Sequence, residues 1–150
     1  MGLSISTLHV RRSIFINASP SVVWRSFEDQ ASVMAWLDAG HTVHSFDPQV
    51  GGVVEMSIPS DGGRVFFGGE VLVVDPEREL SLQVQWKDSP AWPVPMFWTF
   101  RLTSLYDGTL VELFHHGFER LGVSAADQLE DYEGGWTIQH LTGLRALAEA

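Results

Sequence analysis

The sequence predicts an α+β fold, in which a curved antiparallel sheet of about six to seven strands wraps around one long C-terminal helix. The only long helical pattern runs from Ser124 to Ala150. Almost everything between residues 41 and 116 reads as short strands separated by turn residues. A length of 150 residues fits a single domain, residues 1–150. A sheet closed around one helix encloses a pocket more readily than it forms a catalytic cleft.

The first third of the chain predicts one strand followed by two short helices. Val10–Asn17 is β-prone, with Val10, Ile14 and Ile16 on one face. Ser19 before Pro20 is a helix start, because a serine oxygen caps free amides and proline suits the first helical position. The helix that follows carries an apolar stripe, formed by Val22, Val23, Trp24 and Phe27. A second helix covers about Ala31–Leu37.

The middle of the chain predicts six further strands, at His41–Phe46, Val53–Ile58, Arg64–Val74, Leu80–Trp86, Met96–Leu105 and Thr109–His116. Asp61-Gly62-Gly63 and Tyr106-Asp107-Gly108 are turn signals that join neighbouring strands as hairpins. Gly68-Gly69 inside a strand predicts a bulge or a sharp bend. Leu80–Trp86 alternates apolar with polar residues, as a half-buried strand does.

The terminal helix is expected to begin at Ser124, with Asp127 three residues later approximating a capping box. Apolar and aromatic residues recur at helical spacing, at Leu129, Tyr132, Trp136, His140, Gly143 or Leu144, and Leu147. Gly134-Gly135 costs roughly 1 kcal/mol per glycine relative to alanine. A helix that carries this pair is expected to bend there or to approach another backbone closely.

Composition excludes several classes of function. Nine basic against nineteen acidic residues give a formal net charge of −10, which repels nucleic acid. The absence of cysteine excludes disulfides and thiolate chemistry. No apolar run reaches the roughly 18 residues of a membrane span, and no signal-peptide pattern opens the chain, so we expect no membrane insertion and a cytoplasmic location. Six Trp and nine Phe suit either a core or the walls of a ligand cavity.

Several short pieces together carry a family resemblance: Ile14–Trp24, Trp36-Leu37, Gly51-Gly52, Gly69–Leu80, Trp86, Gly108-Thr109, His115–Phe118 and Gly135-Trp136. With these pieces the chain resembles the START/Bet v 1-like (SRPBCC) superfamily, and within it the homologues of the heat-shock-protein-90 ATPase activator. The resemblance implies a helix-grip fold with a cavity between sheet and helix. Family members include co-chaperone domains, small-molecule carriers and relatives with cyclase or hydrolase activity, so function stays open. Relatives often carry leucines four and seven residues after the helix tryptophan, where this chain has His140 and Gly143.

Strand alternation orients one set of side chains toward the terminal helix. The predicted ligand-binding residues are Trp36, Met56, Trp86, Trp98, Phe100, His115, Trp136 and His140. Aromatic walls with two imidazoles as polar groups suit a small hydrophobic or amphipathic molecule. The alternative is that the same rings simply fill a core. No cofactor is implied.

Catalysis is a third interpretation, and the sequence favours it least. His115 and His140 could exchange protons near neutral pH, as in a cyclase or hydrolase. A metal site would need a third ligand, and no His-Glu-x-x-His spacing exists, so no metal is predicted. No Gly-x-Ser-x-Gly motif is present. We therefore assign no catalytic residue.

An interaction module, such as a co-chaperone-like regulator of an ATPase, is the second function class. If His115 points inward, Leu110, Phe114 and Phe118 lie on or near the outer face of the sheet, with Phe97. Apolar residues on an outer face indicate that something covers them. Either a second copy of the chain covers Phe97, Leu110 and Phe114 in a homodimer, or another part of the same chain does.

Overall fold

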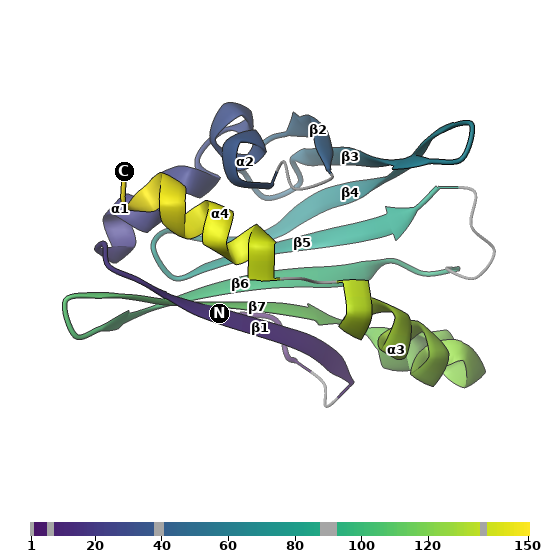
Figure 1. Ribbon diagram of the computed structural model, residues 1–150. Coiled ribbons are helices and arrows are strands. Elements are labelled where there is room, and N and C mark those ends of the chain that lie inside the picture. Colours follow the sequence, from purple (N-terminus) through teal and green to yellow (C-terminus); the bar gives the residue numbers. More distant parts are fainter. Residues whose placement is uncertain (1, 6–7, 38–40, 88–92, 136–137) are drawn as a thin grey trace.

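The computed structural model describes residues 2–5, 8–37, 41–87, 93–135 and 138–150 (Figure 1). Within these ranges one seven-stranded antiparallel sheet has the order β1-β7-β6-β5-β4-β3-β2. Its strands are β1 (His9–Ile16), β2 (Thr42–Phe46), β3 (Val53–Ser60), β4 (Gly63–Asp75), β5 (Glu79–Trp86), β6 (Met96–Leu105) and β7 (Gly108–His116). The α+β helix-grip prediction is confirmed, with every expected strand present.

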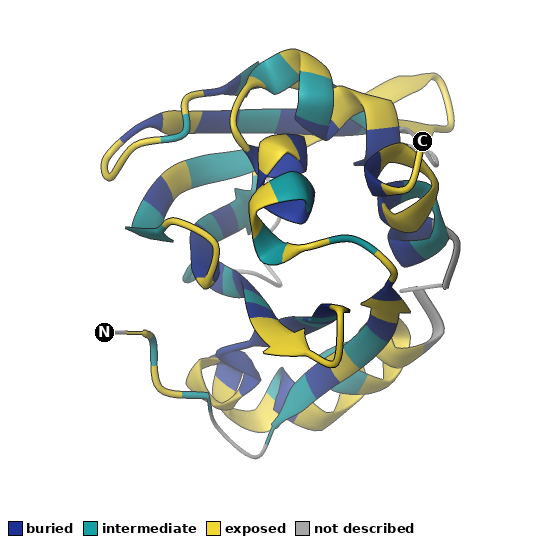
Figure 2. Ribbon diagram, turned by 90° about the vertical axis from the view of Figure 1, so that its left-hand side faces the viewer, coloured by how far each residue is buried: buried dark blue, intermediate teal, exposed yellow. Residues whose placement is uncertain are grey.

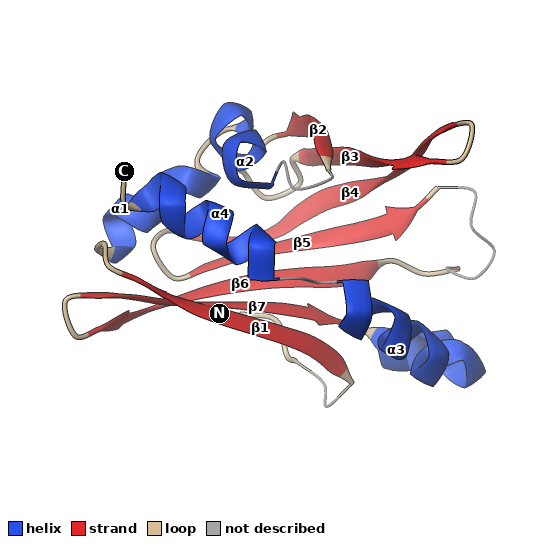
Figure 3. Cartoon of the chain, viewed as in Figure 1, coloured by secondary structure: helices blue, strands red, loops and turns tan. Residues whose placement is uncertain are grey.

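The helices occupy two stretches of the chain. After β1 come α1 (Pro20–Trp24), the 3-10 turn η1 (Arg25–Phe27) and α2 (Gln30–Leu37); after β7 come the 3-10 segment η2 (Phe118–Ser124), α3 (Ala125–Gly135) and α4 (Ile138–Ala148). Helices α1, α2 and α4 group together over the sheet, whereas α3 lies apart, near the other end of β1 and β7 (Figures 1 and 3).

Within the expected helix from Ser124 to Ala150 the structure describes two helical segments, α3 and α4; residues 136–137 lie outside the described residues. Gly134 and Gly135 are the last two described residues of α3. Ser124 ends the 3-10 segment that leads directly into α3, and its hydroxyl donates to the Leu121 carbonyl at 3.2 Å.

The start of α1 follows the sequence prediction. The Ser19 side chain accepts a hydrogen bond from the Val22 amide at 3.4 Å, and Pro20 occupies the first turn. Val23, Trp24 and Phe27 are buried, as the apolar stripe predicts. This anchors the α1–η1–α2 layer on the sheet.

One face of the sheet, called here the inner face, packs against the helices. Residues paired across it include Leu82 with Trp98 and Trp98 with His115. The next row pairs Leu80 with Phe100 and Phe100 with Leu113. Buried and exposed residues alternate along the strands in Figure 2, which is the period-two pattern of a sheet with one packed face.

The bulge expected at Gly68-Gly69 is displaced. Both glycines keep a regular register with β3, and the shift in β4 falls between Val71 and Val73. A Cβ on Gly68 would stand 2.2 Å from the Val54 carbonyl oxygen. The glycine pair therefore permits close approach of neighbouring backbones, the other reason glycine occurs inside strands.

The opposite, outer face carries a buried polar network that the sequence did not reveal. The Leu3 amide donates to the Glu79 carboxylate at 3.2 Å, and Arg101 donates to the Leu3 carbonyl at 2.7 Å. Arg101 also pairs with Glu79 at 3.0 Å. The N-terminal segment thus lies against the sheet and covers part of its outer face.

A hydrogen-bond chain continues this network across three strands. Ser81 donates to Glu79 at 2.8 Å, the Ser81 and Thr99 hydroxyl oxygens are 3.1 Å apart, and Thr99 Oγ1 lies 2.8 Å from His116 Nε2. All four residues are buried. Burial lowers the pKa of His116 to about 4, with neighbouring charges acting in both directions. Buried polar groups in proteins are normally hydrogen-bonded, and the hydrogen-bond chain from Glu79 to His116 supplies these partners.

Among the described helices, none is long and apolar enough to cross a membrane.

Candidate functional site

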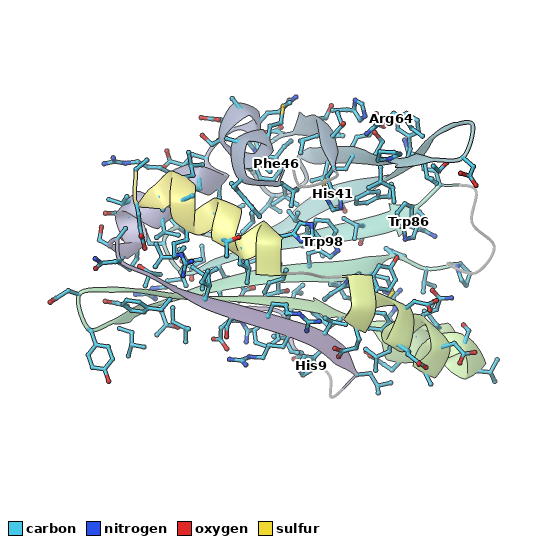
Figure 4. All side chains as sticks on the ribbon, in the orientation of Figure 1. His9, His41, Phe46, Arg64, Trp86 and Trp98 are labelled. Carbon is cyan, nitrogen blue, oxygen red and sulfur yellow. The ribbon has the colours of Figure 1, made fainter. Side chains whose placement is uncertain are left out.

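The inner face divides into two ends of different chemistry. One end, beneath α2 and α4, is apolar, and we call it the apolar end; it contains Phe27, Trp36, Met56, Leu80 and Phe100. The other end carries aromatic and imidazole rings with buried polar atoms. We call it the ring cluster; it consists of His41, Phe67, Trp86, Trp98, His115, Tyr132 and His140. In Figure 4, Phe46 lies by α2, whereas Trp86 and Trp98 lie over the middle strands of the sheet.

The first part of the ring cluster joins β4, β5, β6 and β7 to α3. The rings of Phe67 and Trp86 have centroids 4.6 Å apart, and those of Phe67 and Trp98 are 5.8 Å apart. Trp98 lies 6.1 Å from His115, which lies 4.5 Å from Tyr132. Such tilted and edge-on contacts are the favoured geometries of aromatic pairs.

The second part joins the segment before β2 to α4. The His41 ring lies 5.3 Å from the His140 ring and 5.8 Å from Phe67. It lies 6.3 Å from Trp98. His140, which is 5 % exposed, therefore meets His41 directly. His115 is also linked to His41 through Trp98, which contacts both rings.

Several polar ring atoms of the cluster are buried. These are His41 Nδ1, Trp98 Nε1, His115 Nε2 and His140 Nε2. Trp86 adds an indole N–H that donates to the Tyr132 hydroxyl. The concentration of these polar atoms at one end of the inner face marks this end as a place for polar recognition within apolar surroundings.

Electrostatics keeps two of these groups neutral near pH 7. His115 is 3 % exposed, and its burial, with a smaller effect of His116, lowers its pKa to about 3. Burial raises the pKa of Tyr132 to about 12, although its bond from Trp86 acts in the opposite direction. Desolvation disfavours the charged form in both cases. A neutral His115 donates and accepts hydrogen bonds but is a poor proton donor at physiological pH.

The apolar end is closely packed. Trp36 donates its indole N–H to the Ser26 carbonyl at 3.0 Å, and its ring lies 5.6 Å from Phe100. A cavity of about 10 Å³ remains, lined among others by Trp36, Met56, Phe100 and Trp98. A cavity of roughly 10–15 Å³ holds about one water molecule. At this end the structure favours the alternative interpretation of the rings as core.

The eight predicted ligand-binding residues therefore separate. Trp86, Trp98, His115 and His140 belong to the ring cluster; Trp36, Met56 and Phe100 belong to the apolar end. Trp136 lies outside the described residues. The assignment of these residues to a ligand stays a prediction.

This chain has Gly143 where relatives often carry a leucine, and the structure gives a reason. A Cβ on Gly143 would stand 2.9 Å from the Trp36 carbonyl oxygen. Glycine therefore lets α4 approach the backbone of α2 closely. The space where relatives often place a leucine is occupied by main chain of α2.

Three members of the ring cluster, His41, Phe67 and Tyr132, were not predicted as site residues. Phe67 lies at an inward position of β4 opposite Trp86, so strand alternation could have found it. Tyr132 belongs to the helical spacing that also includes His140, so this periodicity could have found it. His41 precedes β2, and no local pattern distinguishes it.

The outer-face prediction was right for three residues and wrong for one. Phe97, Leu110 and Phe114 lie on the outer face, since they alternate with Trp98, Val111 and His115. Phe118 was placed there too, but it is fully buried on the inner side, with its ring 5.0 Å from His115. The chain reverses at Gly117, whose φ of 95° lies in the left-handed region, and this turns Phe118 back toward the core.

Cover for the outer aromatic residues comes from the chain itself. Phe114 is 9 % exposed; the His9 ring lies 5.5 Å from it and the Arg101 guanidinium 5.8 Å. Arg120 lies 5.4 Å from the Phe97 ring. This arrangement leaves less apolar surface for a second copy than the sequence pattern indicated.

No group of three or more His, Asp or Glu side chains suited to a metal ion occurs within the described ranges.

Solved structures of similar architecture cover nearly the whole chain. Protein CV1439 from Chromobacterium violaceum is 25% identical, with 95% of this chain and 98% of that chain covered and a TM-score of 0.72. Protein MLL2253 from Mesorhizobium loti is 26% identical, with 94% and 96% covered and a TM-score of 0.67. The Aha1 dimer from Colwellia psychrerythraea is 18% identical, with 93% and 96% covered and a TM-score of 0.65; this last likeness shows the fold alone.

A search among curated proteins found no match. The family described as "Activator of Hsp90 ATPase homolog 1-like protein" matches residues 17–149. This range begins at the end of β1 and runs through α4, so it includes both ends of the inner face. The fold of this family supports a ligand-binding or co-chaperone-like domain. The chain belongs to the family of Activator of Hsp90 ATPase homolog 1-like proteins.

Proposed function

We propose that this domain binds a small hydrophobic or amphipathic molecule at the ring cluster, between the sheet and helices α3 and α4. The observation that carries the proposal is the concentration of buried polar ring atoms among aromatic walls at one end of the inner face. Ligand sites combine mostly apolar walls with a few polar groups that fix orientation. Trp86 and Trp98 provide walls, while His115 and His140 supply polar atoms.

We expect a ligand to reach this site beneath α3. Tyr132 is the residue of α3 that contacts His115 and accepts a hydrogen bond from Trp86. Most of α3 faces solvent; of its residues before Gly134 only Ala125 is buried. A ligand that displaces Tyr132 reaches the ring cluster without disturbing the apolar end.

A neutral fluorescent dye tests the proposal directly. N-phenyl-1-naphthylamine, titrated into the purified protein, is expected to bind saturably with one molecule per chain. Native mass spectrometry of the same sample shows whether a molecule from the expression host is already bound. Absence of both saturable dye binding and a co-purified molecule overturns the proposal.

A matched pair of variants locates the binding. Trp86→Ala removes a partly buried wall and should weaken dye affinity about tenfold or more, since burying an aromatic side chain is worth roughly 1.5–3 kcal/mol. Phe66→Ala removes an exposed aromatic side chain from the outer face of the neighbouring strand and should leave dye affinity unchanged. Equal effects of the two variants would place the dye elsewhere.

A co-chaperone-like interaction is the second candidate, and family membership favours it. The exposed acidic side chains of α3, among them Asp127, Glu130 and Asp131, offer a surface for a basic partner. The measurement is the ATPase rate of a heat-shock-protein-90 chaperone with and without this protein. A rate change that is lost when Glu130 and Asp131 are changed to Gln and Asn would favour this candidate.

A homodimer through Phe97, Leu110 and Phe114 is a related candidate, because the similar structure from Colwellia psychrerythraea is described as a dimer. The cover of Phe114 by His9 and Arg101 counts against this surface. Light scattering during size-exclusion chromatography decides it: a dimer that Leu110→Lys converts to monomer would support the interface.

A further inference from the structure

The charge of the groups around the ring cluster limits what the site can accept. The side chains of the ring cluster are two indoles, a phenol, a phenyl group and three imidazoles. The cluster as defined contains no Asp, Glu, Lys or Arg. The nearest cation on the inner side of β1 is Arg12, which pairs with Leu113 in the sheet. Its guanidinium donates to the Glu133 carbonyl at 2.7 Å and lies 3.5 Å from the Glu133 carboxylate. Arg12 is therefore already engaged at the end of α3.

A buried anion would have no counter-charge from the indoles, the phenol or the neutral His115. Moving a carboxylate out of water costs several kcal/mol unless a cation and hydrogen bonds compensate. Protonation of His115 would supply a cation, but its ring is enclosed by Trp98, Phe118 and Tyr132. The same enclosure holds its pKa at about 3. A carboxylate at this place is thus disfavoured by the surroundings and by the imidazole itself.

The covering helix adds a second bias against anions. Between Ala125 and Gly135, α3 carries Asp127, Glu130, Asp131 and Glu133 and has no basic residue. These side chains are exposed, and the whole chain carries a formal net charge of −10. Negative potential around an entrance lowers the local concentration of anions and raises that of cations.

The polar atoms of the cluster are suited to uncharged partners. An indole N–H donates, a neutral imidazole both donates and accepts, and a phenol does both. Flat rings such as Trp86 and Trp98 pack well against a flat aromatic molecule. We infer that the site selects an uncharged, planar aromatic ligand with a hydroxyl or carbonyl group at one edge, an inference that rests on the proposed function.

Three probes of one shape but different charge test this inference by displacement of N-phenyl-1-naphthylamine at pH 7.5. They are 2-naphthol, which is uncharged, 2-naphthoate, an anion, and 2-naphthylmethylamine, a cation. The expected order of affinity is naphthol, then the amine, then the naphthoate. Naphthol should bind at least about tenfold more tightly than naphthoate, because only the anion must be buried without a counter-charge.

The outcomes separate this inference from the proposed function. If the dye does not bind, the proposed function fails. If the dye binds and naphthoate or the amine displaces it as well as naphthol does, the function stands and the selectivity for uncharged ligands is overturned. Dye binding with no displacement by naphthol also overturns the inference.

A variant pair tests the polar contact itself. His115→Leu should weaken naphthol binding severalfold while leaving naphthalene, which lacks the hydroxyl, unaffected. The control His44→Leu changes an exposed histidine that lies 2.8 Å from Ser57 on the outer face, and it should alter neither affinity. Circular dichroism confirms that both variants are folded. Equal loss for naphthol and naphthalene in His115→Leu would contradict a polar role.

Discussion

Helices α3 and α4 come from one continuous helical pattern in the sequence, yet the structure uses them differently. In α4, Leu141 and Leu144 are 0 % exposed, and Gly143 approaches the backbone of Trp36. In α3, Leu129 and Tyr132 are only partly buried. Burial of apolar surface is the main source of helix stability in a protein. The comparison teaches that α4 contributes fully buried apolar side chains to the core. Helix α3 covers the ring cluster and contributes less to the stability of the fold.

The largest expected effect is a difference in the free energy of unfolding between a leucine variant in α4 and one in α3. Leu144→Ala removes a fully buried side chain from α4 and should lower the free energy of unfolding by about 2–5 kcal/mol. Leu129→Ala on α3 should lower it by about 1 kcal/mol or less, since that side chain is partly exposed. Urea denaturation measures both. Similar losses at the two positions would mean that α3 also contributes to the core.

We expect the free energy of unfolding to decrease at acidic pH because of His115, which lies beside α3. The folded pKa is about 3, below the ordinary value of about 6.5. Between these values the unfolded state binds a proton that the folded state does not, so stability falls as pH decreases from 6.5 toward 3. The slope from this group reaches about 1.4 kcal/mol per pH unit.

The measurement is urea denaturation from pH 7 to pH 4.5, compared with His115→Gln. The variant cannot titrate and should show a shallower loss of stability. An identical pH dependence in both proteins would assign the loss to other groups, such as His116.

A smaller effect is expected from adding a methyl group to α4. On helix propensity alone, Gly143→Ala should stabilise by roughly 1 kcal/mol. The new Cβ would stand 2.9 Å from a backbone oxygen of α2, and such overpacking costs about 1–3 kcal/mol. We therefore expect a net lowering of the melting temperature. Ala146→Gly, at an exposed site on the same helix, is the control that measures the effect of helix propensity alone on the melting temperature. If Gly143→Ala instead raised the melting temperature, α4 and α2 would be able to move apart easily.

The smallest effect on global stability is expected from Tyr132→Phe. It removes the acceptor of the Trp86 indole hydrogen bond, at a cost of about 1 kcal/mol. Hydrogen exchange is the informative measurement, because α3 should open locally before the core does. Amides of α3 should exchange faster in the variant than in the native protein, while those of α4 keep their rates. Acceleration in both helices would mean that they open as one unit.

The strands and the first helix were predictable because their determinants are local. Alternation in Leu80–Trp86 and the Ser19-Pro20 helix start depend on neighbouring residues. The orientation of Trp98 and His115 followed from the same alternation.

What sequence reasoning missed depends on distant contacts. His41 enters the ring cluster because the segment before β2 lies close to His140, more than ninety residues away in the printed sequence. Gly143 is explained by the backbone of Trp36, which no periodicity reveals. The cover of the outer face by Leu3 requires the pairing of β5 with β6, because Glu79 and Arg101 meet only across that pair.

The hydrogen-bond chain on the outer face fixes the position of a proton. Ser81 has one hydroxyl hydrogen and donates it to Glu79, so Thr99 must donate to Ser81. Thr99 then has no hydrogen left for His116, whose Nε2 must be the donor in their 2.8 Å contact. His116 is thereby held as the Nε2–H tautomer, and its Nδ1 remains an acceptor while the ring is neutral. A side chain without a hydroxyl at position 99 would release this constraint, so Thr99 sets the tautomer of a histidine on the next strand.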